Sequence, residues 1–193
     1  MHYGYIGLGN LGAACAGCLV KAGFKVTVYD LNPKLAEPLV AMGATLATSA
    51  EDLAGAVDHV ITCLPSPAVS ERVLRNILPR MKKGASWVEM STLGRDEVLT
   101  LAAVAAEAGV RMLELPVTGG VHLAYQGKIT MLAGGDKDLF DLHHAAMQAM
   151  GVDKPFYEIK FDFTLHAEKA NAPATDFARP RAAACPTPGA HAP

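Results

Sequence analysis

The chain has 193 residues, of which 51% are hydrophobic and 19% are charged, and its formal net charge at pH 7 is -2. This balance is typical of a soluble globular protein and excludes a disordered or fibrous one. The length allows one domain of ordinary size with roughly 40 residues to spare. Because the small net charge gives no strong field for nucleic acid or an anionic membrane, we expect neither as a partner. A small molecule is the expected ligand.

Neither a membrane segment nor a disulfide scaffold is indicated. No apolar run reaches the roughly 18 residues of a membrane span, and no basic segment precedes an apolar core near the N-terminus. The four cysteines, at positions 15, 18, 63 and 185, are too sparse for a secreted disulfide framework. We expect reduced thiols and a cytoplasmic location.

Strands and helices are predicted to alternate along most of the chain. Short apolar runs bounded by glycine or polar residues predict strands, and alanine-rich or capped segments predict helices. In chain order these are a strand at 3–9, a helix at 13–23, a strand at 25–30, a helix at 34–42, a strand at 44–48, a helix at 49–56, a strand at 59–64, a helix at 68–74, a strand at 86–91, a helix at 95–108, strands at 111–117 and 128–135, and a helix at 136–151. This order predicts an α/β fold of the Rossmann type, a doubly wound, mostly parallel sheet with helices on both faces.

The last part of the chain has a different composition. After Thr164 it is dominated by Ala, Pro, His and Arg, and it ends "FARPRAAACPTPGAHAP". Such a segment has few large apolar groups with which to offset its ordering entropy. We therefore expect a compact domain over residues 1–155 and a divergent, flexible tail over residues 156–193.

A glycine pattern follows the first predicted strand. It is GxGxxG, with a strand before it and a helix after it, and it consists of Gly7, Leu8, Gly9, Asn10, Leu11 and Gly12. The first glycine permits a tight turn, the second leaves room for a pyrophosphate, and the third lets helix and strand pack closely. Unpaired N–H groups of the helix then face the phosphate. The pattern predicts a dinucleotide-binding loop.

Asp30 stands about 20 residues further on, at the end of the second predicted strand. A carboxylate there can accept hydrogen bonds from the ribose hydroxyls of adenosine and would repel a 2'-phosphate, so NAD is favoured over NADP. Two other interpretations remain: a structural glycine turn with no dinucleotide, and a methyltransferase that uses the acidic residue on its own cofactor's ribose.

Two longer segments resemble the beta-hydroxyacid dehydrogenases, a family that includes 3-hydroxyisobutyrate dehydrogenase and the NAD(P)-binding domain of 6-phosphogluconate dehydrogenase. "GYIGLGNLGAACAGCLVKAGFKVTVYDLNP" is similar to the family's cofactor signature, and "ELPVTGGVHLAYQGKITMLAGG" to its substrate-loop signature. The resemblance implies an NAD-dependent oxidoreductase that oxidises a small 3-hydroxy acid, such as 3-hydroxyisobutyrate, to its semialdehyde by hydride transfer.

The resemblance also implies which loops line the cofactor. Leu64, Pro65 and Ser66 would line the nicotinamide ribose, and Ser91 and Thr92 would contact the cofactor near the nicotinamide. These segments follow predicted strands, and ligands of open parallel sheets bind beyond the carboxyl ends of strands. Helix capping is the alternative role for the Ser-Thr pair.

The implied substrate loop contains Thr118, Gly119 and Gly120. A hydroxyl followed by two glycines places a donor beside exposed backbone N–H groups, which suits a carboxylate. The family usually has serine where this chain has Thr118, and the added methyl group bears on substrate size. His122 is interpreted as a solvated loop residue, with catalysis as the alternative.

The family's catalytic lysine lies on a long helix that opens a second, helical domain, and it exchanges a proton with the substrate hydroxyl. Lys169 falls at about the right distance, with Asn171 two places after it, although the family has its asparagines three and four places after the lysine and has glycines before it that are absent here. Lys169 is the candidate, and a chance lysine is the alternative. We expect a chain truncated before the helical domain, whose uncovered apolar face would favour a homo-oligomer. The alternative function is a non-catalytic NAD(P)-binding module.

Two further motifs have structural interpretations. Cys15 and Cys18 form a CxxC pattern inside the first predicted helix, where packing is favoured and a redox pair is the alternative. His143 and His144 are adjacent on a predicted helix and point in different directions, so no metal site is expected.

Overall fold

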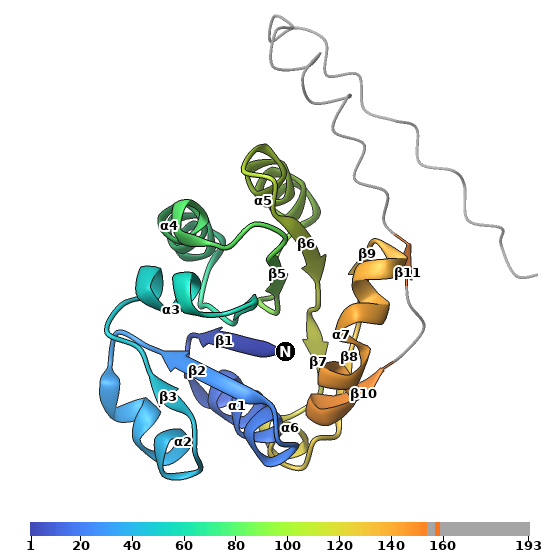
Figure 1. Ribbon diagram of the computed structural model, residues 1–193. Coiled ribbons are helices and arrows are strands. Elements are labelled where there is room, and N and C mark those ends of the chain that lie inside the picture. Colours follow the sequence, from blue (N-terminus) through green and yellow to red (C-terminus); the bar gives the residue numbers. More distant parts are fainter. Residues whose placement is uncertain (154–156, 159–193) are drawn as a thin grey trace, which may run out of the picture. The chain divides into compact units, whose positions relative to one another are not determined.

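The computed structural model describes residues 1–153 and 157–158, and Figure 1 shows these residues as a central sheet between helices. The main sheet contains, in spatial order, β11 (Tyr157–Glu158), β9 (Gly134–Gly135), β6 (Arg111–Glu114), β5 (Ser86–Glu89), β4 (His59–Thr62), β1 (His2–Ile6), β2 (Lys25–Tyr29) and β3 (Thr45–Leu46). Strands β1 to β6 pair in parallel, and β9 pairs antiparallel with β6. The predicted Rossmann-type, mostly parallel sheet is confirmed.

Helices cover both faces of this sheet (Figure 1). They are α1 (Asn10–Lys21), α2 (Glu37–Ala41), α3 (Ala50–Ala56), α4 (Pro67–Ile77), α5 (Arg95–Glu107), α6 (Val121–Tyr125) and α7 (Lys137–Met150), with short 3-10 turns at Pro33–Ala36 and Leu78–Arg80. None of these helices is long and apolar enough to cross a membrane. The strand–helix order brings the carboxyl ends of β1, β4, β5 and β6 to one edge.

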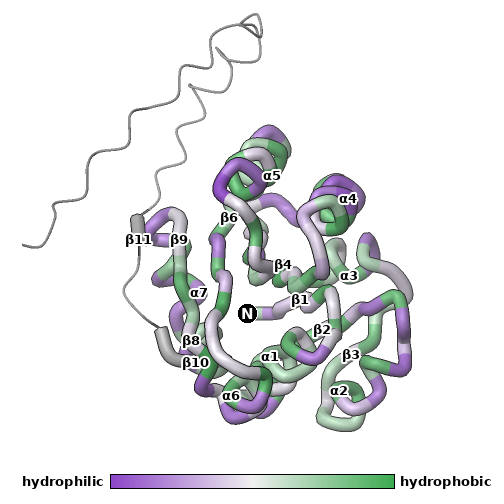
Figure 2. The backbone as a smooth tube through the Cα atoms, turned by 180° about the vertical axis from the view of Figure 1, so that it is seen from behind, coloured by the Kyte–Doolittle hydropathy of each residue, from purple (hydrophilic) through white to green (hydrophobic). Residues whose placement is uncertain are grey.

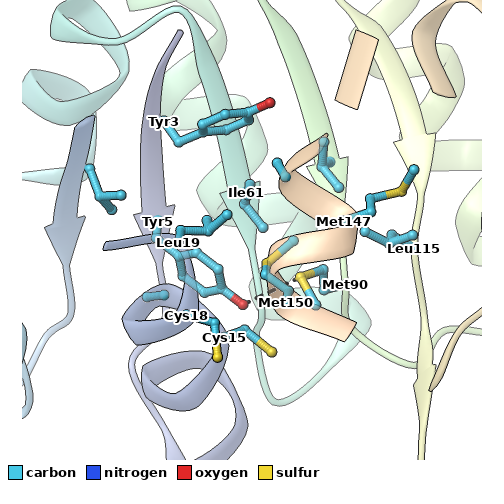
Figure 3. Close-up of a cluster of buried hydrophobic side chains, with 14 of the residues drawn as sticks. Tyr3, Tyr5, Cys15, Cys18, Leu19, Ile61, Met90, Leu115, Met147 and Met150 are labelled. Carbon is cyan, nitrogen blue, oxygen red and sulfur yellow. Dashed lines mark hydrogen bonds between the residues drawn. The ribbon is translucent and has the colours of Figure 1, made fainter. Parts of the chain in front are cut away.

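Two buried clusters hold the layers together. Side chains of α1 and α7 pack on one sheet face; in Figure 3 Leu19 and Met150 lie near Tyr5, whose hydroxyl donates to the sulfur of Met90 at 3.3 Å. Side chains of α3, α4 and α5 pack on the other face, around Trp87. Figure 2 shows hydrophobic and hydrophilic segments mixed along α4 and α5, as helices with one buried side require.

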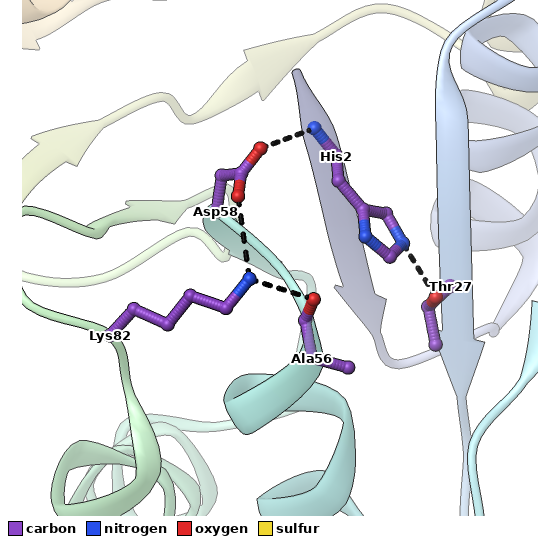
Figure 4. Close-up of polar contacts among 5 residues, drawn as sticks. All are labelled: His2, Thr27, Ala56, Asp58 and Lys82. Atoms are coloured by element: carbon purple, nitrogen blue, oxygen red, sulfur yellow. Dashed lines mark hydrogen bonds and ion pairs between the residues drawn. The ribbon is translucent and has the colours of Figure 1, made fainter.

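The amino end of the sheet is held by polar contacts that Figure 4 shows. The carboxylate of Asp58 accepts from the backbone N–H of His2 at 2.9 Å and pairs with Lys82, which also donates to the carbonyl of Ala56. The ring of His2 lies 2.8 Å from the hydroxyl of Thr27. These contacts fasten the first residues of β1 to β2 and to the start of β4.

A buried histidine pair lies near the same end of the sheet. The ring of His143, on α7, is 3.0 Å from the hydroxyl of Tyr3 and 2.8 Å from that of Ser86, which also lies 2.8 Å from the ring of His59. Among the described residues, no group of three or more His, Cys, Asp or Glu is placed to hold a metal ion. His143 itself is a buried residue of the core with a hydrogen-bond partner at each ring nitrogen.

The segment at 128–135 is not the single strand that its apolar pattern predicts. Its first half is β8 (Ile129–Met131), which pairs with β7 (Val117–Thr118) and β10 (Gly151–Asp153) in a separate small sheet, whereas its second half, β9, joins the main sheet. The predicted strand at 111–117 is interrupted as well, because Pro116 has no N–H to donate to a ladder. The chain thereby leaves the main sheet after Glu114 and builds the small one.

Candidate functional site

The glycine loop lies between β1 and α1, at the carboxyl edge of the sheet. Gly7 has φ +94, and a Cβ there would lie 2.3 Å from the carbonyl oxygen of Cys63. A Cβ at Gly12 would lie 2.0 Å from the carbonyl oxygen of Gly7. Real Cβ atoms do not approach backbone this closely, so both positions require glycine to keep this turn against the first turn of α1.

Gly9 differs from Gly7 and Gly12, because a methyl side chain at this position would meet no other residue. It is exposed, it begins α1 as the N-cap residue, and a Cβ there would meet no atom within 4 Å. No side chain caps this helix end, and Asn10 beside it is exposed as well. The first N–H groups of a helix have no partner within it, so the loop presents uncapped donors beneath open space. The arrangement suits an anion such as a pyrophosphate.

Asp30 lies directly beside this loop. Its Oδ2 accepts from the backbone N–H of Leu8 at 2.7 Å, and its Oδ1 accepts from that of Asn32 at 2.8 Å. The side chain is only partly buried. The carboxylate thus connects the glycine loop to the turn that follows β2.

The carboxyl ends of β4 and β5 lie side by side, and a hydrogen bond connects the segments that follow them. The parallel register pairs Ile6 with Thr62 and Thr62 with Glu89, so the segments after these strands begin at the same level. The backbone N–H of Leu64 donates to Oγ of Ser91 at 2.8 Å. Two of the predicted cofactor segments therefore lie in direct contact, and Leu64 also lies next to Gly7.

Serine capping operates at one of these segments only. Ser66 is the N-cap of α4, and its Oγ accepts from the backbone N–H of Val69 at 3.4 Å. The N-cap of α5 is Gly94, so the capping alternative for the Ser91–Thr92 pair is wrong. Pro65 and Thr92 are exposed at the edge of the sheet.

The pattern-based interpretation missed Glu89, the last residue of β5. Its side chain is completely buried, its Oε1 accepts from the backbone N–H of Ser91 at 2.7 Å, and its Oε2 accepts from the hydroxyl of Thr62 at 2.9 Å. Burial raises the pKa of Glu89, while the hydrogen bonds from Ser91 and Thr62 oppose that rise. An acidic residue at the end of an otherwise apolar strand is the signal that could have identified it.

The predicted substrate loop leads from the small sheet into α6. Thr118 is the last residue of β7, Gly119 has φ +121, and Gly120 is the N-cap of α6. Thr118 and Gly119 are exposed. His122 lies in α6, not in a loop as expected, and its exposed ring packs so closely on Gly120 that a Cβ there would be 2.6 Å from Nδ1.

The two cysteines of the CxxC pattern are packing residues. Cys15 and Cys18 are buried on α1, and Cys18 donates to the carbonyl of Ala124 at 3.3 Å. Burial raises the pKa of Cys15 to about 12 and also raises that of Cys18. A helix start that activates thiolates would lower these pKa values, so the structure favours packing over the redox alternative.

Both thiols should therefore resist alkylation in the native protein. We expect iodoacetamide at pH 8 to modify Cys15 and Cys18 at least about 100-fold more slowly than after unfolding in urea, because the thiolate is the reactive form. Peptide mapping by mass spectrometry after timed quenching gives the rate for each cysteine. Rapid native modification of Cys15, at the rate of the unfolded chain, would contradict this assignment.

Lys169, the candidate for proton transfer, and the predicted tail lie outside the described residues. The family described as the NAD binding domain of 6-phosphogluconate dehydrogenase matches residues 2–159. This match covers most of the chain.

Curated relatives agree with this match. The mitochondrial 3-hydroxyisobutyrate dehydrogenase of Drosophila melanogaster is 34% identical over 151 residues, which cover 78% of this chain and 47% of the relative. The NAD-dependent L-serine dehydrogenase of Pseudomonas aeruginosa is 35% identical over 150 residues, covering 76% of this chain and 50% of the relative. The chain spans about half the length of these two relatives.

A solved structure shows the same fold. The 3-hydroxyisobutyrate dehydrogenase of Mycobacterium tuberculosis, determined with L-serine, superposes with a TM-score of 0.79 at 26% identity, over 89% of this chain and 60% of that one. The resemblance to the beta-hydroxyacid dehydrogenases is thereby confirmed. The chain belongs to the family of NAD(P)-binding domains typified by that of 6-phosphogluconate dehydrogenase.

Proposed function

We propose that this chain binds NAD and supplies the cofactor domain of a dehydrogenase for small 3-hydroxy acids. The glycine loop carries the proposal: Gly9 leaves open space above an uncapped helix end, and the carboxylate of Asp30 lies beside it. These residues fit a dinucleotide, with the pyrophosphate at the helix end and the adenosine ribose at Asp30. The segments Leu64–Ser66 and Ser91–Thr92 would then face the nicotinamide half.

Roles in the reaction follow from the same assignment. Bound NAD would supply a hydride acceptor. The hydroxyl of Thr118 and the N–H groups of Gly119 and Gly120 would bind the substrate carboxylate, and Lys169 would take the proton from the substrate hydroxyl. Two relatives are named for 3-hydroxyisobutyrate and L-serine, which both carry a hydroxyl group on the third carbon. This shared chemistry supports a 3-hydroxy acid as the substrate class.

Asp30 provides the test of cofactor choice. The wild-type chain should bind NAD more tightly than NADP in calorimetric titrations. Asp30→Ala should weaken NAD binding by about tenfold and reduce the preference for NAD, because the ribose acceptor and the repulsion of a 2'-phosphate are both removed.

The control for this substitution is Asp58→Ala, which removes a carboxylate at the opposite end of the sheet and should leave both affinities unchanged. Equal NAD and NADP affinities in the wild type would contradict the assignment of Asp30. Binding of NAD without turnover of any 3-hydroxy acid by the full chain would favour the alternative, a non-catalytic NAD-binding module.

A further inference from the structure

Glu89 has hydrogen bonds that lead away from the core and toward the candidate cofactor segments. Its carboxyl group is completely buried and accepts from the backbone N–H of Ser91 and from the hydroxyl of Thr62. Burying a carboxyl group costs free energy that only such hydrogen bonds offset. Both donors lie at strand ends: Thr62 is the last residue of β4, and Ser91 follows β5 by two residues.

The connection continues from Ser91 to the neighbouring segment. Oγ of Ser91 accepts from the backbone N–H of Leu64 at 2.8 Å, so the buried carboxyl group, Ser91 and Leu64 form one chain of contacts. A second branch runs from the indole N–H of Trp87, which donates to Oγ of Thr62 at 2.7 Å. Trp87 is the chain's single tryptophan, so its emission reports on this network.

We propose that Glu89 is a positioning residue for the cofactor site, holding the segments Leu64–Ser66 and Ser91–Thr92 in one fixed arrangement through Ser91. The inference rests on the proposed function, in that these segments face the nicotinamide half of the dinucleotide. The hydrogen-bond partners of Glu89 are Thr62 and Ser91, and neither belongs to the glycine loop or contacts Asp30 through a hydrogen bond. The loss of Glu89 should therefore affect the two halves of the dinucleotide unequally, whereas a general loss of folding would affect both.

The matched control lies on the same strand. Ser86, the first residue of β5, is buried and hydrogen-bonded like Glu89, but its partners are His59 and His143. Ser86→Ala therefore disturbs a buried polar network in β5 without touching the segments at the carboxyl edge. It should leave dinucleotide affinity unchanged.

The full chain should be titrated with NADH and, separately, with ADP, which carries only the adenosine half. Glu89→Ala should weaken NADH binding by about tenfold and ADP binding by no more than about twofold, because the hydrogen bonds that hold the nicotinamide-side segments are lost. Glu89→Gln should restore NADH affinity to within about threefold of the wild type, since its amide oxygen can accept from Ser91 and its NH2 can donate to Thr62. In Glu89→Ala the emission of Trp87 should shift, and in Glu89→Gln it should remain closer to that of the wild type.

Several results would overturn the proposal: equal weakening of NADH and ADP by Glu89→Ala, unchanged NADH affinity in that variant, or no recovery in Glu89→Gln. If the wild type binds neither ligand, the proposed function fails, and amide hydrogen exchange still decides the coupling. In Glu89→Ala the exchange of the Leu64 N–H should rise at least about tenfold, although Leu64 bonds to Ser91 and not to Glu89. Unchanged exchange at Leu64 refutes the coupling.

Ser91→Ala tests the second contact if Glu89→Ala does not fold. This small substitution removes Oγ, the acceptor of the Leu64 N–H, and keeps the backbone N–H that donates to Glu89. Exchange should rise at Leu64 and stay slow at residue 91. Continued protection of Leu64 in this variant would show that Ser91 does not hold the segment, and the proposal would be wrong.

Discussion

The Gly9→Ala variant should fold as the wild type does and lose NAD binding by about 100-fold or more. The backbone of Gly9, with φ -61 and ψ -175, is open to any residue, and an added methyl group would touch no protein atom within 4 Å. The methyl group would instead occupy the space that the pyrophosphate needs above the first turn of α1. Calorimetric titration with NAD and a thermal melt measure the two quantities separately.

Gly12→Ala is the contrasting variant, three residues along the same loop. Its methyl group would lie 2.0 Å from the carbonyl oxygen of Gly7, so α1 must move away from β1. We expect a loss of roughly 3 kcal/mol in the free energy of unfolding, as for overpacking against backbone. If Gly9→Ala binds NAD with wild-type affinity, the pyrophosphate does not bind at this loop. An unchanged melting temperature of Gly12→Ala would contradict the close approach of α1 to β1.

Acidification below pH 6.5 should destabilise the protein through its buried histidines. His143 is 1% exposed, and burial, with smaller contributions from the charges of His59 and Arg111, lowers its pKa from 6.5 to about 3. Burial likewise lowers the pKa of His59. Between pH 6.5 and 3 the unfolded chain binds a proton at position 143 that the folded chain does not. The stability is therefore complete above pH 6.5 and is lost as the pH falls toward 3.

The free energy of unfolding should fall by roughly 1 kcal/mol per pH unit of acidification for each such histidine, as measured by urea unfolding at a series of pH values. His143→Leu should be less stable at pH 8, since Tyr3 and Ser86 lose a hydrogen-bond partner. Its free energy of unfolding should also fall less steeply on acidification, because the contribution of one histidine is missing. His122→Leu, an exposed substitution on α6, serves as the control and should keep the wild-type slope. Identical slopes in the wild type and His143→Leu would show that His143 does not carry this effect.

The glycine loop could be predicted from the sequence because its chemistry is local. Three glycines, the strand before them and the helix after them lie within about 20 residues, and each requirement acts on the backbone of the residue itself or of a near neighbour. The alternation of apolar runs and helical segments likewise follows from short-range periodicity, which determined the α/β class. The family resemblance rests on two such contiguous motifs.

The division of residues 128–135 into two strands could not be predicted in this way. The apolar pattern of the segment fits one strand, and the segment becomes two because Ile129–Met131 pairs with Val117–Thr118 while Gly134–Gly135 pairs with β6. The choice between partners depends on where distant strands lie. The hydrophobic periodicity of a segment does not indicate which strand the segment will pair with.

The sequence alone therefore determined the fold class, the position of the glycine loop and the placement of Asp30 after the second strand, since these follow from local backbone geometry and hydrophobic period. Only the tertiary structure decided that Glu89 reaches Ser91 and Thr62, and that His143 lies between Tyr3 and Ser86. The partners in these buried contacts include residues 27, 57 and 140 positions apart. A buried polar group must find a hydrogen-bond partner, and folding, not spacing along the chain, determines which one is near.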